Sequence, residues 1–238
     1  MIDLTGFSRF EISGEGTSQW LETLITGRLP KIGKVGLVYF SSHKGKVLTE
    51  MTATRISEDH IWLLTGAGAY WHDRDWLNFN LPESSNIKIV DTTHDLGTML
   101  LTGPKSDLLI AKLTDEKTDN ESFPWLSHKS IKLCGEDTRI LKVSYAGEKG
   151  FEIHVHNGSM KKIYDELIQH GENFNLIHFG MLALDSMRLE KNYRSWKSDL
   201  TSDYTMLQSG LEKWITFDKG NFIGKEALKN EFDLGTSK

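Results

Sequence analysis

The sequence predicts an α+β fold with mainly antiparallel sheets and packed helices. Short β-type segments and amphipathic helical segments are mixed along all 238 residues. They neither alternate strictly, as in parallel α/β folds, nor separate into long blocks. Hydrophobic residues make up 38% of the chain and charged residues 26%, which is typical of a globular protein that buries a sizeable core. Two subdomains are expected, one formed by residues 1–40 plus 138–238 and the other by 41–137.

Alternating apolar residues, cap residues and glycines define the elements of the first half. Thr17 or Ser18 can cap a helix that keeps its apolar residues on one face and ends at Gly27. Gly45 suits a left-handed position in the turn between two strands. The expected elements are a strand over 7–13, a helix from 17 or 18 to 26, strands over 35–40, 47–56 and 61–65, and a helix containing 70–77.

The second half follows the same reasoning. Pro104 suits the first position of a helix, and Gly171 can end another. The polar stretch 114–124 is the best candidate for a surface loop. The expected elements are strands over 86–90 and 97–102, a helix over 104–113, strands over 129–133, 138–144 and 151–156, and helices over 160–170 and about 178–191.

Charge, cysteine content and hydropathy exclude several classes of function. The formal net charge is −5 and the pI about 6.0, so no nucleic-acid partner and no acidic membrane surface are expected. The single cysteine, Cys134, excludes an internal disulfide framework, and we expect an inert thiol there. The beginning of the chain resembles no signal peptide, and no window approaches 18 apolar residues. A cytoplasmic protein without membrane association is therefore expected.

Two motifs suggest ligands but have ordinary alternatives. Gly66-Ala67-Gly68 resembles a dinucleotide loop, yet Trp71 stands where the third glycine should be. A turn between strand and helix is favoured. His154 and His156 lie two apart on a predicted strand and so face the same side. They lack an evident third ligand, so a surface or half-buried pair is favoured and no metal site is expected.

Glu148 and Trp196 are candidates for binding a flat heterocycle. Glu148 lies between Gly147 and Gly150, which would let the backbone approach a ligand closely. Its carboxylate could accept two hydrogen bonds from an amidine-like edge such as that of a pterin; the alternative is an exposed glutamate in a turn. Trp125 and Trp196 lie near polar loop residues, so each indole could stack on such a ligand, although buried packing is the commoner use.

Three segments, in this order, resemble the signatures of one family. They are residues 144–152 (SYAGEKGFE), 183–194 (ALDSMRLEKNYR) and 218–228 (DKGNFIGKEAL). The resemblance is to the folate-binding aminomethyltransferases, whose founder is the glycine-cleavage T-protein, and it runs from Asp3 to Leu228. Residues 29–39 and 193–200 look most like the folate-binding part of dimethylglycine and sarcosine dehydrogenases.

The resemblance implies a tetrahydrofolate site in a central crevice, with Glu50 as its catalytic residue. The family places an acidic residue, usually Asp, at this point of the strand after the glycine-containing hairpin, and here the segment reads GKVLTE. The additional methylene of Glu50 moves the carboxylate by roughly 1.5 Å. Thr52 shares the strand face with Glu50 and could orient that carboxylate or touch the folate.

The resemblance also implies which other residues bind folate. Glu148 matches the pterin-binding carboxylate, and Tyr39 matches a tyrosine that lines the pocket. Arg188 matches the arginine of a Ser-Leu-Arg-Leu-Glu motif, with an intrahelical ion pair to Asp185 as the alternative. The expected folate-binding residues are Tyr39, Thr52, Tyr145, Glu148, Arg188 and Trp196.

The expected function is tetrahydrofolate-dependent transfer of an aminomethyl or methylene unit by an aminomethyltransferase-like enzyme. No FAD-binding G-x-G-x-x-G is present, so a separate flavoprotein would oxidise an N-methyl amine such as dimethylglycine or sarcosine. Glycine-derived aminomethyl groups and methylated sulfur or oxygen compounds are donors for other relatives. The C-terminal barrel of these relatives, on the order of 100 residues, is not expected here, because the sequence has only ten residues after Leu228.

Two alternatives to this enzyme remain open. The first is a folate-binding module without chemistry, and the second is a subunit of a larger oxidase or dehydrogenase complex. A related branch that serves iron–sulfur cluster assembly carries a cysteine in a Lys-Gly-Cys segment. Asn221 stands at that position here, which counts against cluster assembly.

Overall fold

The computed structural model describes residues 1–235, which form two compact units. Unit 1 contains Met1–Phe7, Gly33–Val35 and Thr92–Tyr193, and unit 2 contains Ser8–Ile32, Gly36–Asp91 and the described chain from Arg194 onward. These units group the chain differently from the expected subdomains of 1–40 plus 138–238 and 41–137. The difference arises because the strands at 96–102 and 128–133 join those at 136–141 and 150–156 in one sheet, whereas the strand at 8–13 joins the sheet of unit 2.

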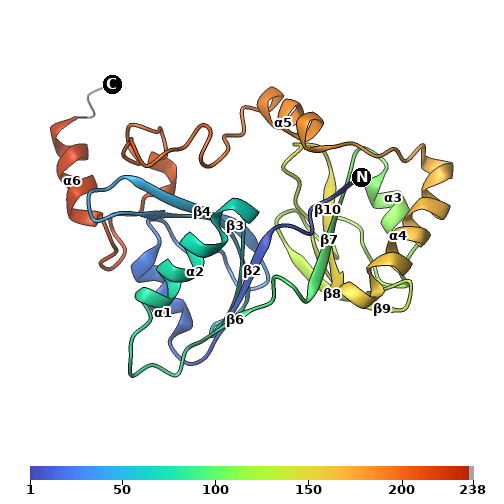
Figure 1. Cartoon of the computed structure of the whole chain (residues 1–238), viewed down its shortest axis with the longest axis horizontal. Coiled ribbons are helices and arrows are strands. Elements are labelled where there is room, and N and C mark those ends of the chain that lie inside the picture. Colours follow the sequence, from blue (N-terminus) through green and yellow to red (C-terminus); the bar gives the residue numbers. More distant parts are fainter. Residues whose placement is uncertain (236–238) are drawn as a thin grey trace. The chain divides into compact units, whose positions relative to one another are not determined.

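Unit 1 is built on a five-stranded antiparallel sheet in the order β1-β7-β10-β9-β8 (Figure 1). Its central strand β10 pairs Ile153 with Met99 of β7 and with Ile140 of β9. The strands are β1 (Ile2–Asp3), β7 (Leu96–Thr102), β8 (His128–Leu133), β9 (Glu136–Leu141) and β10 (Gly150–His156).

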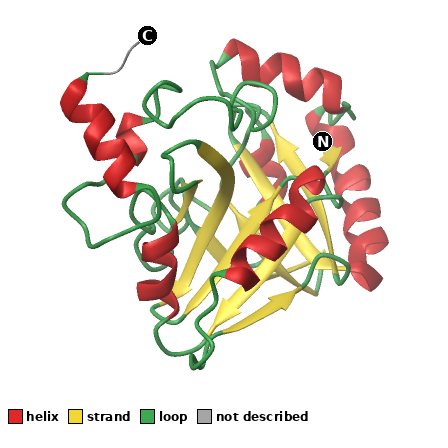
Figure 2. Cartoon of the chain, turned by 60° about the vertical axis from the view of Figure 1, so that its left-hand side comes forward, coloured by secondary structure: helices red, strands yellow, loops and turns green. Residues whose placement is uncertain are grey.

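The helices of unit 1 follow from its amphipathic segments. Ile163 and Leu167 of α4 are fully buried in a core that includes Ile153, so α4 packs on one face of the sheet (Figure 2). The α4 helix begins three residues before its predicted start because His156 Nδ1 accepts a hydrogen bond from the Gly158 N–H at 3.2 Å. The helices are α3 (Ser106–Ile110), α4 (Asn157–Gly171), η2 (Glu172–Phe174) and α5 (Met181–Glu190).

Unit 2 contains the second five-stranded sheet, in the order β3-β4-β5-β2-β6. Phe10 and Ile12 of β2 are fully buried on one face, as the predicted period of two requires, and Arg9 between Ser8 and Phe10 is buried as well. The strands are β2 (Ser8–Ser13), β3 (Val35–Ser41), β4 (Val47–Ser57), β5 (His60–Thr65) and β6 (Lys88–Asp91).

Helices and a glycine turn complete unit 2. Leu21 of α1 and Leu77 of α2 are fully buried in a core with Phe10 and Ile12. Gly45 has φ +73°, which confirms its predicted left-handed turn. The helices are α1 (Thr17–Leu24), η1 (Ala67–Ala69), α2 (Tyr70–Phe79), η3 (Glu212–Trp214) and α6 (Lys225–Leu234).

The α+β prediction is confirmed: every strand pair with a defined register in residues 1–235 is antiparallel. Four predicted elements are too long: α1 ends at Leu24 rather than 26, and α5 covers Met181–Glu190 rather than about 178–191. The α3 helix covers only Ser106–Ile110 of the predicted 104–113, and β9 ends at Leu141 rather than 144. No helix in the described part of the chain has the length and hydropathy needed to span a bilayer.

Candidate functional site

Glu50 lies half-buried in the middle of β4, in unit 2. The Tyr39 hydroxyl on neighbouring β3 donates a hydrogen bond to its carboxylate, and the positive charge of Arg194 also acts on it. Burial raises the pKa of Glu50, whereas the Tyr39 hydrogen bond and the Arg194 charge lower it; burial is the larger effect. The net result is a carboxylate with a raised pKa that accepts a hydrogen bond from Tyr39 and lies in the electrostatic field of Arg194.

Arg194 was not among the predicted site residues. Its guanidinium donates hydrogen bonds to the Ser209 and Gly210 carbonyl oxygens, the latter at 3.0 Å. These bonds fix a cation whose sequence position is far from Glu50. The only signal in the sequence was its place in the segment 193–200, and a contact over such a separation cannot be inferred from local spacing.

Trp196 lies half-buried in unit 2 and contacts the same strand as Glu50. Its indole Nε1–H donates to the Leu48 carbonyl of β4 at 3.2 Å, and its ring packs on a cluster that contains buried Tyr39. The Lys197 ammonium lies 4.8 Å from the indole centroid. Thr52 is half-buried two residues after Glu50. Unit 2 thus holds Tyr39, Glu50, Thr52 and Trp196, whose contacts with folate stay predictions.

Glu148 lies in unit 1, in the exposed turn that precedes β10, and forms an ion pair with Lys191. The Glu148 Oε1 to Lys191 Nζ distance is 3.2 Å, and the two side chains are 50% and 41% exposed. Both glycines around Glu148 have packing roles within unit 1. A Cβ on Gly147 would lie 2.3 Å from Lys191 Cγ, and one on Gly150 would lie 2.6 Å from Ser144 Cβ. Neighbouring protein atoms therefore account for the two glycines that the sequence suggested for close approach of a ligand.

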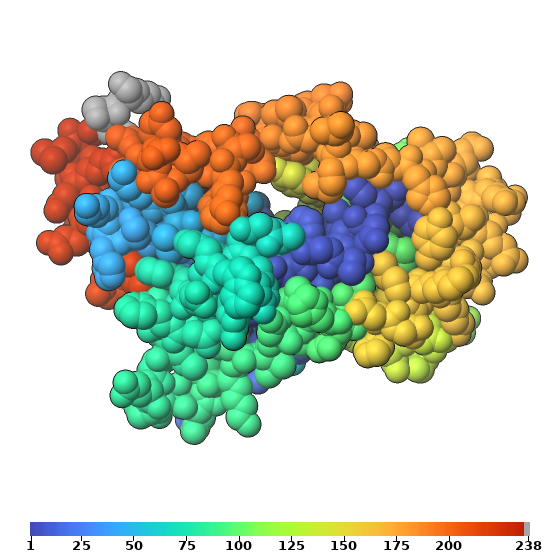
Figure 3. Space-filling model, viewed as in Figure 1, coloured from blue at the N-terminus to red at the C-terminus, as the bar shows by residue number. Residues whose placement is uncertain are grey.

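Arg188 is almost fully buried on α5 and fixes the turn that carries Lys191. Its Nε donates to Asp185 Oδ1 at 2.7 Å, so the intrahelical ion pair is present. Its guanidinium also donates to the Tyr193 carbonyl at 2.9 Å, and the Tyr193 N–H donates back to the Arg188 carbonyl at 2.9 Å. The α5 helix and the segment after it lie at the surface (Figure 3).

Tyr145 belongs to the same part of unit 1. Its ring stacks on that of Tyr193, with centroids 6.3 Å apart and planes 19° apart. Arg188, Tyr145 and the Glu148–Lys191 pair are therefore linked through the turn at 191–193. Folate binding by Tyr145, Glu148 and Arg188 remains a prediction.

The other motifs have ordinary structural roles. Residues 66–69 form the turn between β5 and α2, as predicted. His154 is buried and hydrogen-bonded to the Thr98 hydroxyl at 2.7 Å, whereas exposed His156 caps α4. Among residues 1–235, no three His, Cys, Asp or Glu side chains are placed to hold a metal ion.

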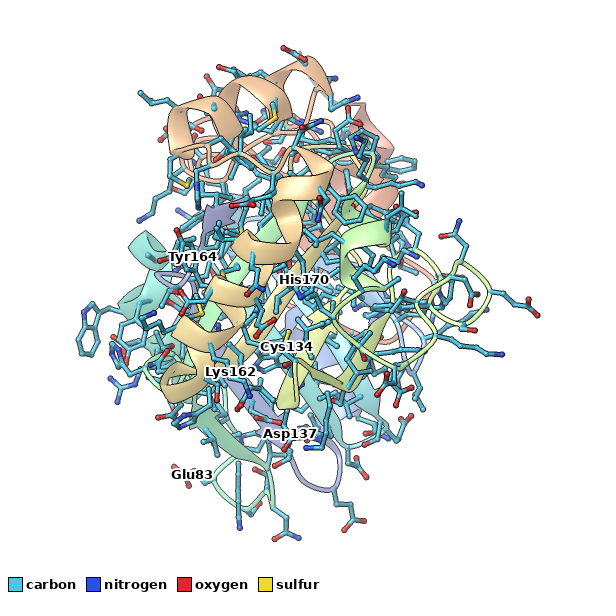
Figure 4. The ribbon with its side chains drawn as sticks, turned by 90° about the vertical axis from the view of Figure 1, so that its right-hand side faces the viewer. Glu83, Cys134, Asp137, Lys162, Tyr164 and His170 are labelled. Carbon is cyan, nitrogen blue, oxygen red and sulfur yellow. The ribbon has the colours of Figure 1, made fainter. Side chains whose placement is uncertain are left out.

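Cys134 lies beside α4, close to Lys162 (Figure 4). It occupies the turn between β8 and β9 and packs against the core of unit 1. Burial raises the pKa of its thiol to about 11, and the charge of Glu166 adds to that effect. The thiol is therefore protonated at neutral pH and unsuited to nucleophilic attack, as predicted.

Comparison with known proteins gives consistent matches over nearly the whole chain. Residues 1–219 match the family model described as GCVT N-terminal domain. Dimethylglycine dehydrogenase from Rattus norvegicus is 31% identical over 96% of this chain, which spans only 27% of that protein. Aminomethyltransferase from Thermoanaerobacter sp. (strain X514) is 26% identical over 99% of this chain, which spans 64% of that protein.

Two solved structures share the fold. Glycine cleavage system aminomethyltransferase T from Bartonella henselae aligns with a TM-score of 0.86 and 21% identity, covering 98% of this chain and 63% of that one. A chain of the heterotetrameric sarcosine oxidase from Corynebacterium sp. U-96 aligns with a TM-score of 0.58 and 15% identity. That alignment covers 75% of this chain and 86% of the oxidase chain.

Proposed function

Because this chain belongs to the GCVT N-terminal domain family, we propose that it transfers a one-carbon unit to tetrahydrofolate. Tetrahydrofolate is the acceptor substrate in this proposal, and the carbon arrives bound to an amine nitrogen. The names of two relatives, aminomethyltransferase and dimethylglycine dehydrogenase, support an amine-derived donor. The observation that carries the proposal is the half-buried Glu50 carboxylate with its raised pKa, which accepts a hydrogen bond from Tyr39 and feels the charge of Arg194.

Glu50 acts as the general base. When a folate amine nitrogen attacks the iminium carbon of the donor, a C–N bond forms and that nitrogen must lose a proton. Glu50 accepts this proton and returns it to the donor amine, which leaves as its bond to the carbon breaks. A second folate nitrogen then attacks the same carbon and gives up its own proton through Glu50 to solvent, which completes methylenetetrahydrofolate. A base in such a position contributes ~10²–10⁴-fold to the rate. Burial suits Glu50 to the task, because a raised pKa brings the carboxylate closer to the pH at which it must hold the proton.

Tyr39 and Arg194 position the base. The longer side chain of Glu50, compared with the family's usual Asp, requires its carboxylate to be held in a defined place. The Tyr39 hydroxyl fixes one carboxylate oxygen, and the Arg194 charge favours return to the ionised form after each turnover. Because misplacement by about 1 Å can cost 10²-fold in rate, the Tyr39 hydrogen bond contributes to the rate by fixing the carboxylate.

The proposed donor is an N-methyl amine such as dimethylglycine or sarcosine. A flavoprotein oxidises the amine to an iminium ion, which then meets tetrahydrofolate on this chain. Support comes from the match to dimethylglycine dehydrogenase, of which this chain spans 27%.

In unit 1, Glu148 is the proposed pterin-binding carboxylate.

The decisive experiment separates folate binding from transfer. Wild type, Glu50→Gln and Glu58→Gln are titrated with tetrahydrofolate by anaerobic calorimetry. Each is then mixed with tetrahydrofolate, dimethylglycine and a dimethylglycine-oxidising flavoprotein in the presence of a formaldehyde scavenger. The scavenger suppresses the spontaneous reaction of free formaldehyde with folate. Glu58→Gln is the matched control, because Glu58 lies in the same unit but pairs with Arg55 at 2.5 Å.

We expect all three proteins to bind tetrahydrofolate and only Glu50→Gln to lose methylenetetrahydrofolate formation, by ~10²-fold or more. Loss of both binding and transfer in Glu50→Gln would make Glu50 a structural residue. Wild-type binding without transfer would favour the folate-binding module or the oxidase subunit instead. The structural match to a chain of a heterotetrameric oxidase keeps the subunit as the second candidate.

A further inference from the structure

Lys191 is held against Glu148 by the shape of the backbone as well as by charge. Its Nζ lies 3.2 Å from Glu148 Oε1. Its Cγ, Cδ and Cε run so close to Gly147 that a Cβ there would meet them at 2.3, 2.9 and 3.1 Å. The aliphatic stem of Lys191 thus lies across a glycine with φ +74°, which leads the ammonium to the carboxylate.

The backbone of Lys191 is fixed as well. Its N–H donates to the Arg188 carbonyl at 3.2 Å, directly after the end of α5. The Arg188 guanidinium donates a hydrogen bond to the Tyr193 carbonyl. Hydrogen bonds to Arg188 therefore fix the backbone of the turn at both its first and its last residue. An ordinary surface ion pair joins two freely rotating side chains. The Lys191 side chain, by contrast, already lies beside Glu148 in the protein without ligand, because its backbone and its stem are both fixed.

A carboxylate with an adjacent ammonium matches one particular edge of a heterocycle. The Glu148 oxygens accept hydrogen bonds, and the ammonium of Lys191 only donates them. A 4-oxopterin presents two donors in a row, the 2-amino group and N3–H, followed by one acceptor, the oxygen at position 4. When Glu148 binds the two donors, one of its oxygens lies beside that ring oxygen, and two acceptors repel each other. An ammonium between them bonds both and removes the repulsion.

We propose that Lys191 donates a hydrogen bond to the 4-oxo oxygen of the pterin held by Glu148, and so selects 4-oxopterins over 4-aminopterins. This assignment rests on the proposed function, since it concerns the same ligand. A 4-amino group in place of the oxygen presents a donor to the ammonium and leaves N3 without its hydrogen. One hydrogen bond to Glu148 and one to Lys191 are lost, and only the second depends on the lysine. Lys191 is thus a specificity-determining residue rather than a participant in the chemistry.

The test compares two ligands that differ at position 4 and in the hydrogen on N3, which the 4-amino ring lacks; the second difference is the same for every variant. Tetrahydrofolate and its 4-amino analogue are titrated anaerobically by calorimetry into wild type, Lys191→Met, Lys191→Arg and Lys149→Met. Lys191→Met keeps the length of the stem along Gly147 and removes the donor. Lys149→Met is the matched control, because it removes the same charge one residue from Glu148, where the lysine pairs with Asp107 at 2.9 Å.

The ratio of the two dissociation constants is the measured quantity. In Lys191→Met we expect it to shift about tenfold towards the 4-amino analogue, the size of one hydrogen bond to a charged group. Wild type, Lys149→Met and Lys191→Arg should keep the original preference, because each retains a cationic donor at position 191. Equal melting temperatures of the four proteins would exclude loss of the fold as the cause.

Three results would overturn the assignment. An unchanged ratio in Lys191→Met would show that the lysine does not contact position 4. An equal gain in affinity for both ligands would show that Lys191 competes with the ligand for the Glu148 carboxylate and does not distinguish the group at position 4. The proposed function survives either result. If wild type bound neither ligand, the proposed function itself would fail, and the role of Lys191 with it.

Discussion

Replacement of Lys219 by methionine tests how the segment 218–228 is joined to α1 in unit 2. The Lys219 side chain is only 4% exposed. Its ammonium donates to the Glu22 and Ile25 carbonyl oxygens at 2.7 Å each, to the Gly27 carbonyl, and to Glu22 Oε2 at 3.2 Å. It therefore caps the carbonyl end of α1, where a cation is favourable.

Burial of the Lys219 ammonium opposes this stabilisation, and its effect on the free energy of unfolding can be measured. Burial lowers the pKa of Lys219 from 10.5 to about 8, although Glu22 raises it. This lowering corresponds to a cost of about 3 kcal/mol for keeping the charge at neutral pH. Since the unfolded chain binds the proton more tightly, the free energy of unfolding rises with pH between about 8 and 10.5. Below pH 8 the full cost is present, and above 10.5 it is gone.

Lys219→Met removes this pH dependence together with the hydrogen bonds. The bonds account for a loss of about 1–3 kcal/mol that does not depend on the charge. Wild type should gain about 2 kcal/mol relative to the variant between pH 7.5 and 9.5. Urea unfolding of both proteins across this range gives the difference, in which all other titrating groups cancel. Lys229→Met is the control, because Lys229 is exposed on α6, and its difference from wild type should stay constant.

A constant difference between wild type and Lys219→Met would refute the reasoning. It would mean that the three carbonyls and Glu22 compensate fully for burial and leave the pKa where it is in the unfolded chain. A difference that falls with rising pH would show a raised pKa instead, with the cap outweighing burial.

Three further variants test the glycine turn, the base and the buried arginine. Gly45→Ala should lower the free energy of unfolding by about 1–2 kcal/mol because of the left-handed φ of +73°. The loss should be larger still, since the new Cβ would lie 2.9 Å from a leucine Cγ. Gly220→Ala is the control in the same urea titration and should change this free energy little, because the space around Gly220 is open. Glu50→Gln should become more stable relative to wild type as pH rises above 4.5, because the raised pKa makes the folded protein lose stability on ionisation; a trend in the other direction in urea midpoints would contradict the burial argument. Arg188→Met should cost about 1–3 kcal/mol and speed amide exchange at Tyr193, whose N–H and carbonyl both bond this residue; unchanged exchange would show that the turn holds without the arginine.

Local chemistry is what the sequence could determine by itself. Periodicity placed β2, because the side chains of a strand alternate between two faces regardless of the rest of the chain. Gly45 and the turn at residues 66–69 were also correct, since turn conformation depends on a few consecutive residues. The boundaries of α3 and β9 were wrong, because helix and strand ends depend on packing and capping partners elsewhere.

Contacts between distant segments were decided only by the tertiary structure. The sequence suggested Glu50 through a family resemblance, but not the guanidinium of Arg194 that acts on it or the burial that raises its pKa. Likewise, the glycines beside Glu148 were visible, whereas the stem of Lys191 that requires Gly147 was not. The physical reason is the same in each case. A pKa or an ion pair depends on which groups folding brings within a few ångströms, and the order of residues along the chain does not contain those distances.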